Sequence, residues 1–111
     1  MRIDFKLTGH DKGISITCIA GESYKDAVSK ALSYTQLFDP TLTEADLTPT
    51  YIWKGEVSVS ISLIEEGYWF LSFAQPGKTL PTERLHCDAA TIGDKAIGYL
   101  DHFNATAGMF C

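Results

Sequence analysis

The chain has 111 residues, 45% of them hydrophobic, and a formal net charge of −5 at pH 7. This length suits one domain, residues 1–111, and the negative charge disfavours direct binding to nucleic acid or to an anionic membrane. No apolar run approaches the roughly 20 residues of a membrane-spanning helix, and no apolar stretch of signal-peptide type begins the chain, so we expect a soluble protein that is monomeric when alone.

Alternating apolar residues predict two strands in the first 20 residues. The segments RIDFKLT (2–8) and ISITCIA (14–20) place an apolar side chain at every second position. Between them, GHDKG (9–13) supplies two glycines and an aspartate, which suit a tight turn. We therefore expect a β-hairpin at the amino terminus.

The apolar period then changes to that of a helix. Between Ser23 and Pro40, residues of one face recur every three or four positions, at Tyr24, Ala27, Val28, Ala31, Thr35 and Phe38. Ser23 is a suitable N-cap with Asp26 three residues later, and Pro40 should end the helix at or before Asp39. We expect residues 39–50 to form a loop or a short helical turn.

Three further segments predict a β-meander. TYIW (50–53), EVSVSISLI (56–64) and YWFLSFA (68–74) are separated by turn-sized gaps that each contain a glycine. RLHC (84–87) is a candidate for one more short strand. A second helix should follow with Thr91 as its N-cap, and its apolar residues are Ile92, Ala96, Tyr99, Leu100 and Phe103. Gly93 and Gly98 should each weaken this helix by about 1 kcal/mol relative to alanine.

The order β-β-α-β-β-β-(β)-α predicts an α+β fold with an antiparallel sheet of about five to six strands and two helices packed on one face. The alternation assigns seven apolar residues to the face that meets the helices: Val57, Val59, Ile61, Leu63, Trp69, Leu71 and Phe73. The opposite face then carries Ser58, Ser60, Ser62, Tyr68 and Phe70. A flat polar face with aromatics suits recognition of a partner, although cross-strand aromatics also stabilise a sheet by themselves.

Negative charge is concentrated in one quarter of the sequence. Between Asp39 and Glu66 the only base is Lys54, and the acids are Asp39, Glu44, Asp46, Glu56, Glu65 and Glu66. The rest of the chain is neutral overall. This distribution favours a cationic partner, while the alternative is a solvated acidic segment that supports solubility.

No motif for catalysis, metal binding or nucleotide binding is present. The three histidines lack the short spacings of zinc ligands, and the glycines form no phosphate-binding pattern, so we expect no metal and no cofactor. The three cysteines are an odd number without redox spacing, which favours reduced thiols and a cytoplasmic location. The adjacent His86 and Cys87 leave open a small enzyme or a ligand-binding module that uses the sheet face. A subunit that oligomerises through a sheet edge is a further alternative.

The segment VSVSISLIEEGYWFLSFAQPG (57–77), with a capped helix ESYKDAVSKAL before it and a closing helix DKAIGYLDHF after it, resembles the immunity proteins of bacterial polymorphic toxin systems. The ending NATAGMFC lacks the proline and tryptophan ending of one such family, while the broader and sequence-diverse contact-dependent inhibition immunity proteins remain compatible. The resemblance implies a non-enzymatic antitoxin that binds a cognate toxin domain, often a nuclease. From this resemblance and the charge pattern, we expect seven residues to bind the partner: Asp39, Glu44, Asp46, Glu65, Glu66, Tyr68 and Phe70.

Overall fold

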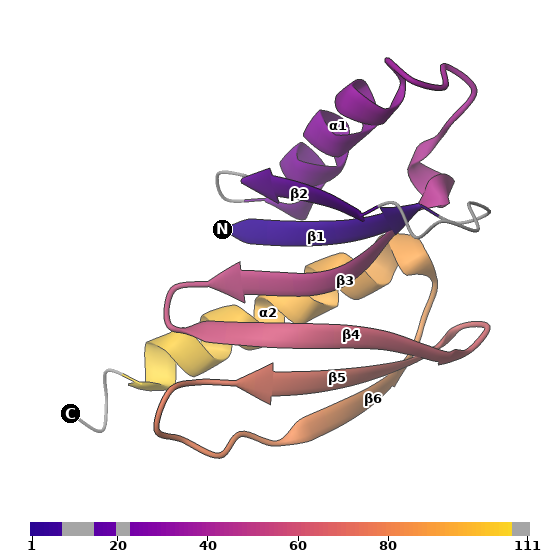
Figure 1. The fold of residues 1–111 in the computed structure, drawn as a ribbon. Coiled ribbons are helices and arrows are strands. Elements are labelled where there is room, and N and C mark those ends of the chain that lie inside the picture. The colour runs from indigo at the N-terminus through magenta and orange to yellow at the C-terminus, as the bar shows by residue number, and fades with distance from the viewer. Residues whose placement is uncertain (8–14, 20–22, 108–111) are drawn as a thin grey trace.

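A computed structural model describes residues 1–7, 15–19 and 23–107 of the chain (Figure 1). The strands of these residues are β1 (Arg2–Leu7), β2 (Ser15–Ile19), β3 (Leu47–Lys54), β4 (Val57–Glu65), β5 (Tyr68–Ala74) and β6 (Thr82–His86). The helices are α1 (Tyr24–Thr35), a short 3-10 helix η1 (Glu44–Asp46) and α2 (Ala89–Ala107). The turn predicted at residues 9–13 lies outside the described residues.

The described strands form one antiparallel sheet in the order β2-β1-β3-β4-β5-β6. β1 pairs with β2 on one side and with β3 on the other, so the amino-terminal hairpin extends the meander into a single sheet. Both helices cover the same face, with α1 next to β2 and α2 across β3 and β4 (Figure 1). The predicted α+β class is confirmed.

The hydrophobic core lies between the sheet and the two helices. The sheet contributes Ile3, Phe5, Leu7, Ile52, Val57, Val59, Ile61, Trp69, Leu71 and Phe73. The helices contribute Tyr24, Ala27, Val28, Ala31, Ile92, Ala96, Ile97 and Leu100. Six of the seven inward positions predicted for the meander are therefore confirmed. Leu63 lies opposite Trp69 on the same face and lines a cavity with it, but 55% of Leu63 is exposed because it lies near the end of β4.

Helix α1 begins as predicted and ends before Asp39, as expected, although its apolar face does not reach Phe38. The Ser23 hydroxyl accepts a hydrogen bond from the Asp26 amide at 3.1 Å, which confirms the N-cap. The helix ends at Thr35, because the amides of Phe38 and Asp39 both turn back to the Thr35 carbonyl. The prediction that Phe38 continues the apolar face was wrong, and 90% of this residue is exposed.

Helix α2 begins two residues before the predicted cap. Its amino terminus is capped by Asp88, whose carboxylate accepts hydrogen bonds from the hydroxyl and the amide of Thr91. These bonds lower the pKa of Asp88 below its ordinary value. The assignment of Thr91 as the N-cap was therefore wrong: it is the third residue of the helix, where its hydroxyl completes the capping turn.

Strand β3 also begins earlier than expected. Residues 39–50 were predicted as a loop or short helical turn, and η1 occupies only 44–46 before β3 starts at Leu47. Pro49 lies within the strand opposite Phe5, where the pairing with β1 shifts register between Asp4 and Phe5. Such irregularities are the positions at which a strand tolerates proline.

Candidate binding surface

The β4–β5 turn and the strand residues beside it form an exposed end of the sheet, which we call the hairpin end (residues 63–68). Glu65 is paired with Tyr68, and Gly67 adopts a φ of 80° that closes the turn. Glu65 and Glu66 are both exposed. The turn therefore presents two adjacent carboxylates, as the sequence predicted.

Apolar side chains on the hairpin end are exposed as well. Leu63, Ile64 and Tyr68 are 55%, 54% and 49% exposed. The register of β4 against β5 shifts between Leu63 and Glu65, so Ile64 occupies a bulge and interrupts the alternation. Ile64, Glu65 and Tyr68 line one cavity of this end, and Leu63 and Glu66 line another. The hairpin end therefore presents large apolar side chains and two carboxylates to solvent, a composition typical of a protein-binding surface.

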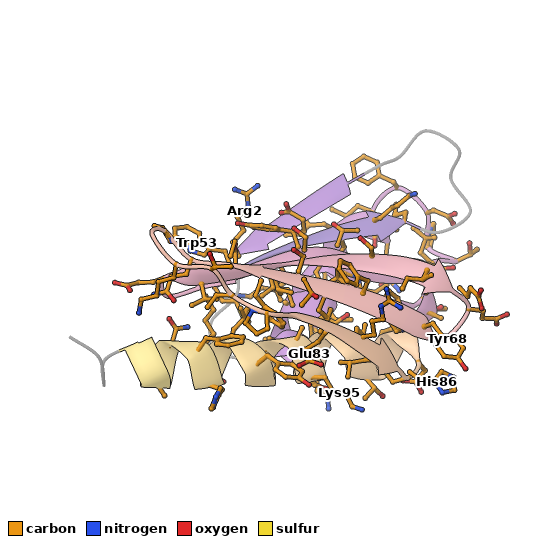
Figure 2. The ribbon with its side chains drawn as sticks, turned by 90° about the horizontal axis from the view of Figure 1, so that it is seen from below. Arg2, Trp53, Tyr68, Glu83, His86 and Lys95 are labelled. Carbon is orange, nitrogen blue, oxygen red and sulfur yellow. The ribbon has the colours of Figure 1, made fainter. Side chains whose placement is uncertain are left out.

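The polar sheet face has the residues predicted for it. Ser60, Ser62 and Tyr68 are exposed and Phe70 is half-buried, so this set lies on the face away from the helices. The Tyr68 ring stacks on His86 of β6, with ring centroids 4.3 Å apart and an angle of 12° between the planes. Figure 2 shows this pair at one end of the sheet. The stack holds the Tyr68 ring in place, which lowers the entropy cost of using it as an anchor.

Phe70 has a more enclosed position than Tyr68. Its neighbours across the sheet are Ser62 on β4 and Arg84 on β6. It therefore contributes to the floor of the surface rather than to a projecting contact. Glu65 and Tyr68 line a shallow cavity of about 420 Å³ together with Arg84 and other residues of this end.

Acidic residues from three separate segments meet around the start of α2. Glu66 and Asp88 line a cavity of about 700 Å³ that also contacts Ala45 of η1. Glu44, Asp88 and Asp94 line a neighbouring cavity, which Ala45 also lines. In Figure 1, η1, the β4–β5 turn and the first residues of α2 all lie on the right. The structure thus brings predicted Glu44 and Glu66 to one end of the fold.

The remaining two predicted acids organise the loop before β3. The Asp39 carboxylate accepts hydrogen bonds from the amide and the hydroxyl of Thr41, at 3.0 and 2.6 Å. The Asp46 carboxylate accepts one from the Thr43 amide at 2.8 Å. Both therefore shape the backbone of their own loop. In Figure 1 that loop runs from the end of α1 down to η1 on the right.

Sequence reasoning missed two acids and one aromatic group. Asp88 and Asp94 belong to the start of α2, where acidic residues usually signal a helix cap rather than a site. Trp53 is 49% exposed, and Tyr51 lies two residues earlier on the same face, with the Arg2 guanidinium 5.9 Å from its ring centroid. The alternation in TYIW was the sequence signal for Tyr51 and Trp53. Figure 2 shows Trp53 at the opposite end of the sheet from Tyr68.

His86 and Cys87 project in different directions. The His86 ring stacks on Tyr68 on the open face, whereas the Cys87 side chain packs against the hydrophobic core. Burial raises the pKa of the Cys87 thiol, which reduces the fraction of reactive thiolate. Within residues 1–7, 15–19 and 23–107, no group of three or more His, Cys, Asp or Glu side chains is placed to hold a metal ion.

In the part of the chain that the structure describes, none of the helices has the length and apolarity needed to cross a membrane. Comparison with known proteins gives no further information: no family model, no curated protein and no solved structure matches the chain.

Proposed function

We propose that this protein is a non-enzymatic inhibitor, an immunity protein of the bacterial cytoplasm that binds and neutralises a cognate toxin domain with a basic surface, such as a nuclease. The observation that carries the proposal is the hairpin end, where Leu63, Ile64 and Tyr68 are exposed beside Glu65 and Glu66. The resemblance of residues 57–77 to immunity proteins of toxin systems points to the same role.

Each component of the hairpin end has a separate part in such binding. The exposed apolar side chains supply area that a partner removes from water, at about 25 cal/mol per Å². Tyr68 supplies a rigid aromatic anchor, because its ring is already stacked on His86. Glu65 and Glu66 supply the charge that attracts a basic surface over a longer distance.

A basic nuclease is the partner class that this charge fits best. Nuclease domains bind phosphates through lysine and arginine, so their substrate surface attracts carboxylates. Glu44 of η1, with Asp88 and Asp94 at the start of α2, extends the electronegative end beyond the hairpin. An inhibitor with this distribution associates rapidly with the substrate surface that it blocks.

Reversing the charge of the hairpin end should slow binding. In a Glu65→Lys/Glu66→Lys variant, we expect the association rate with the toxin domain encoded beside this gene to fall by about tenfold or more at low salt. The difference from wild type should shrink as salt rises, because exposed charges become screened. Stopped-flow or surface-binding kinetics at two ionic strengths measure this.

The control is Glu56→Lys, a charge reversal at the other end of β4. We expect it to slow association less than either reversal in the hairpin end, tested singly. An equal effect from all three positions would show that net charge alone determines the rate.

Truncating Tyr68 should act on dissociation instead. We expect Tyr68→Ala to raise the dissociation rate from the toxin domain by about 30-fold, corresponding to about 2 kcal/mol, with little change in association. Trp53→Ala is a matched control, because both residues are 49% exposed on the same sheet face and lie at opposite ends of it. Wild-type rates for both the Tyr68 and the glutamate variants would remove the hairpin end from the interface.

A further inference from the structure

A separate cavity of about 590 Å³ lies where α1, η1 and the start of α2 meet. Its walls are largely apolar and include Val28, Leu47, Ala45, Ala89 and Ala90. Charged residues contributed by each of these three helices also line it. The cavity therefore combines apolar walls with charges, which is the composition of a site for an amphipathic ligand.

Tyr24 gives this cavity a polar group carried on a buried ring. The residue is only 6% exposed, and its ring contacts Phe5 at a centroid distance of 6.0 Å. On another side the ring lies against Gly93 of α2 so closely that a Cβ there would overlap it. No hydrogen bond joins the Tyr24 hydroxyl to another described residue, and no buried side-chain oxygen or nitrogen among these residues lacks a partner, so the hydroxyl is the part of Tyr24 that reaches the cavity. There it can both donate and accept a hydrogen bond.

Two carboxylates from different helices act on that hydroxyl. The pKa of Tyr24 is raised well above its ordinary value, first by burial and then by the negative charges of Asp94 and Glu44. Both carboxylates also line the cavity. The hydroxyl oxygen and the two carboxylates that line the cavity form a set of acceptors, and acceptors of this kind bind a cationic donor.

The other charged groups at the cavity leave its potential negative. Asp88 is occupied by its hydrogen bonds to Thr91, and its charge offsets the partial positive charge of the α2 amino terminus. Lys25 is the basic residue among those that line the cavity. Its single positive charge is outnumbered by the three carboxylates of Glu44, Asp88 and Asp94.

We infer that this cavity binds an ammonium or guanidinium group carried on a short apolar chain, with the cation between Glu44 and Asp94, the Tyr24 oxygen as a further acceptor, and the chain against the apolar walls. This chemistry belongs both to a lysine or arginine side chain of a partner protein and to a free alkylamine. The site is distinct from the hairpin end, and its binding of a free cation does not depend on the proposed function.

The first test uses the isolated protein and three probes that share one apolar chain. We expect n-hexylamine to bind saturably in an NMR titration, with shifts at the residues that line the cavity. Hexan-1-ol should bind about tenfold more weakly, because it lacks the charge-assisted hydrogen bonds, and hexanoate should bind less than either. Equal binding of the amine and the alcohol, or an absence of saturable amine binding, would overturn the inference.

Three variants locate the site on the protein. Glu44→Gln and Asp94→Asn should each weaken n-hexylamine binding by about tenfold. Tyr24→Phe should also weaken it while leaving the melting temperature close to wild type, because it keeps the ring and removes only the hydroxyl. Asp26→Asn is the control. It removes an exposed charge from α1, the helix of Tyr24, at a residue that does not line the cavity. If the control weakens binding as much as the other three, the cavity is not the site.

Binding of the toxin domain then distinguishes the two sources of the cation. If Glu44→Gln and Asp94→Asn weaken toxin binding and n-hexylamine competes with it, the ligand is a lysine or arginine of the partner. If the variants lose binding of n-hexylamine but bind the toxin domain as wild type does, the ligand is a free amine. A protein that binds no toxin domain but still binds the amine refutes the proposed function and supports this inference.

Discussion

Replacing Trp69 with alanine should lower the free energy of unfolding by about 3–5 kcal/mol. The side chain is only 3% exposed within the core, so truncation leaves a large cavity between the sheet and the helices. Its indole nitrogen also donates a hydrogen bond to the Cys87 carbonyl at 2.9 Å, and alanine leaves that carbonyl without this donor. Urea denaturation followed by circular dichroism measures the change.

Leu63→Ala is the matched control, because Leu63 lies directly opposite Trp69 in the β4–β5 pairing and is 55% exposed. We expect its effect to stay below about 1 kcal/mol, since little buried surface is lost. Trp69→Phe should be intermediate, because it keeps most of the ring volume and loses the hydrogen bond. A Trp69→Ala variant as stable as wild type would contradict the assignment of the buried sheet face.

Gly93→Ala should destabilise the protein although alanine is the better helix former. A Cβ at this position would overlap the Cε2 and Cζ atoms of the Tyr24 ring. That ring is itself buried and packed against Phe5, so it has little room to move. We expect overpacking to cost about 1–3 kcal/mol net, measured as a lower denaturation midpoint with an unchanged slope.

Gly98 of the same helix provides the opposite result. Apart from its own turn of helix, a Cβ there meets no atom of the described residues within 4 Å, so Gly98→Ala should raise stability by about 1 kcal/mol through helix propensity alone. Combining Gly93→Ala with a smaller residue at position 24 should recover part of the loss, which a double-mutant cycle measures. If both glycines respond alike to alanine, α2 does not pack against the Tyr24 ring.

The two glycines also show what local sequence patterns do not determine. From the sequence, both were expected to weaken α2 by the same amount, because helix propensity depends on residue type. Their difference arises from packing: α1 brings Tyr24 against position 93 and brings nothing against position 98. The same contact holds the Tyr24 hydroxyl at the cavity for which we infer cation binding.

The two faces of the sheet could be predicted from the sequence, because strand side chains alternate with a period of two whatever they pack against. The valines of β4 and the aromatic and aliphatic residues of β5 were therefore placed inward correctly, and the serines outward. The cap at Ser23 was equally local, since it joins groups three residues apart. Leu63 and Phe38 are nevertheless exposed, because alternation and helical period say nothing about where the covering layer ends.

The sequence by itself thus determined the α+β class, the buried sheet face, the acidic turn at Glu65 and Glu66, and the place of Tyr68 beside them. Only the tertiary structure decided that Glu44 and Glu66 converge with Asp88 and Asp94 at the start of α2, and that Tyr24 lies within reach of two of these charges. Periodicity and capping are properties of neighbouring residues. Proximity between residues far apart in the chain depends on how the helices pack on the sheet, which no local pattern specifies.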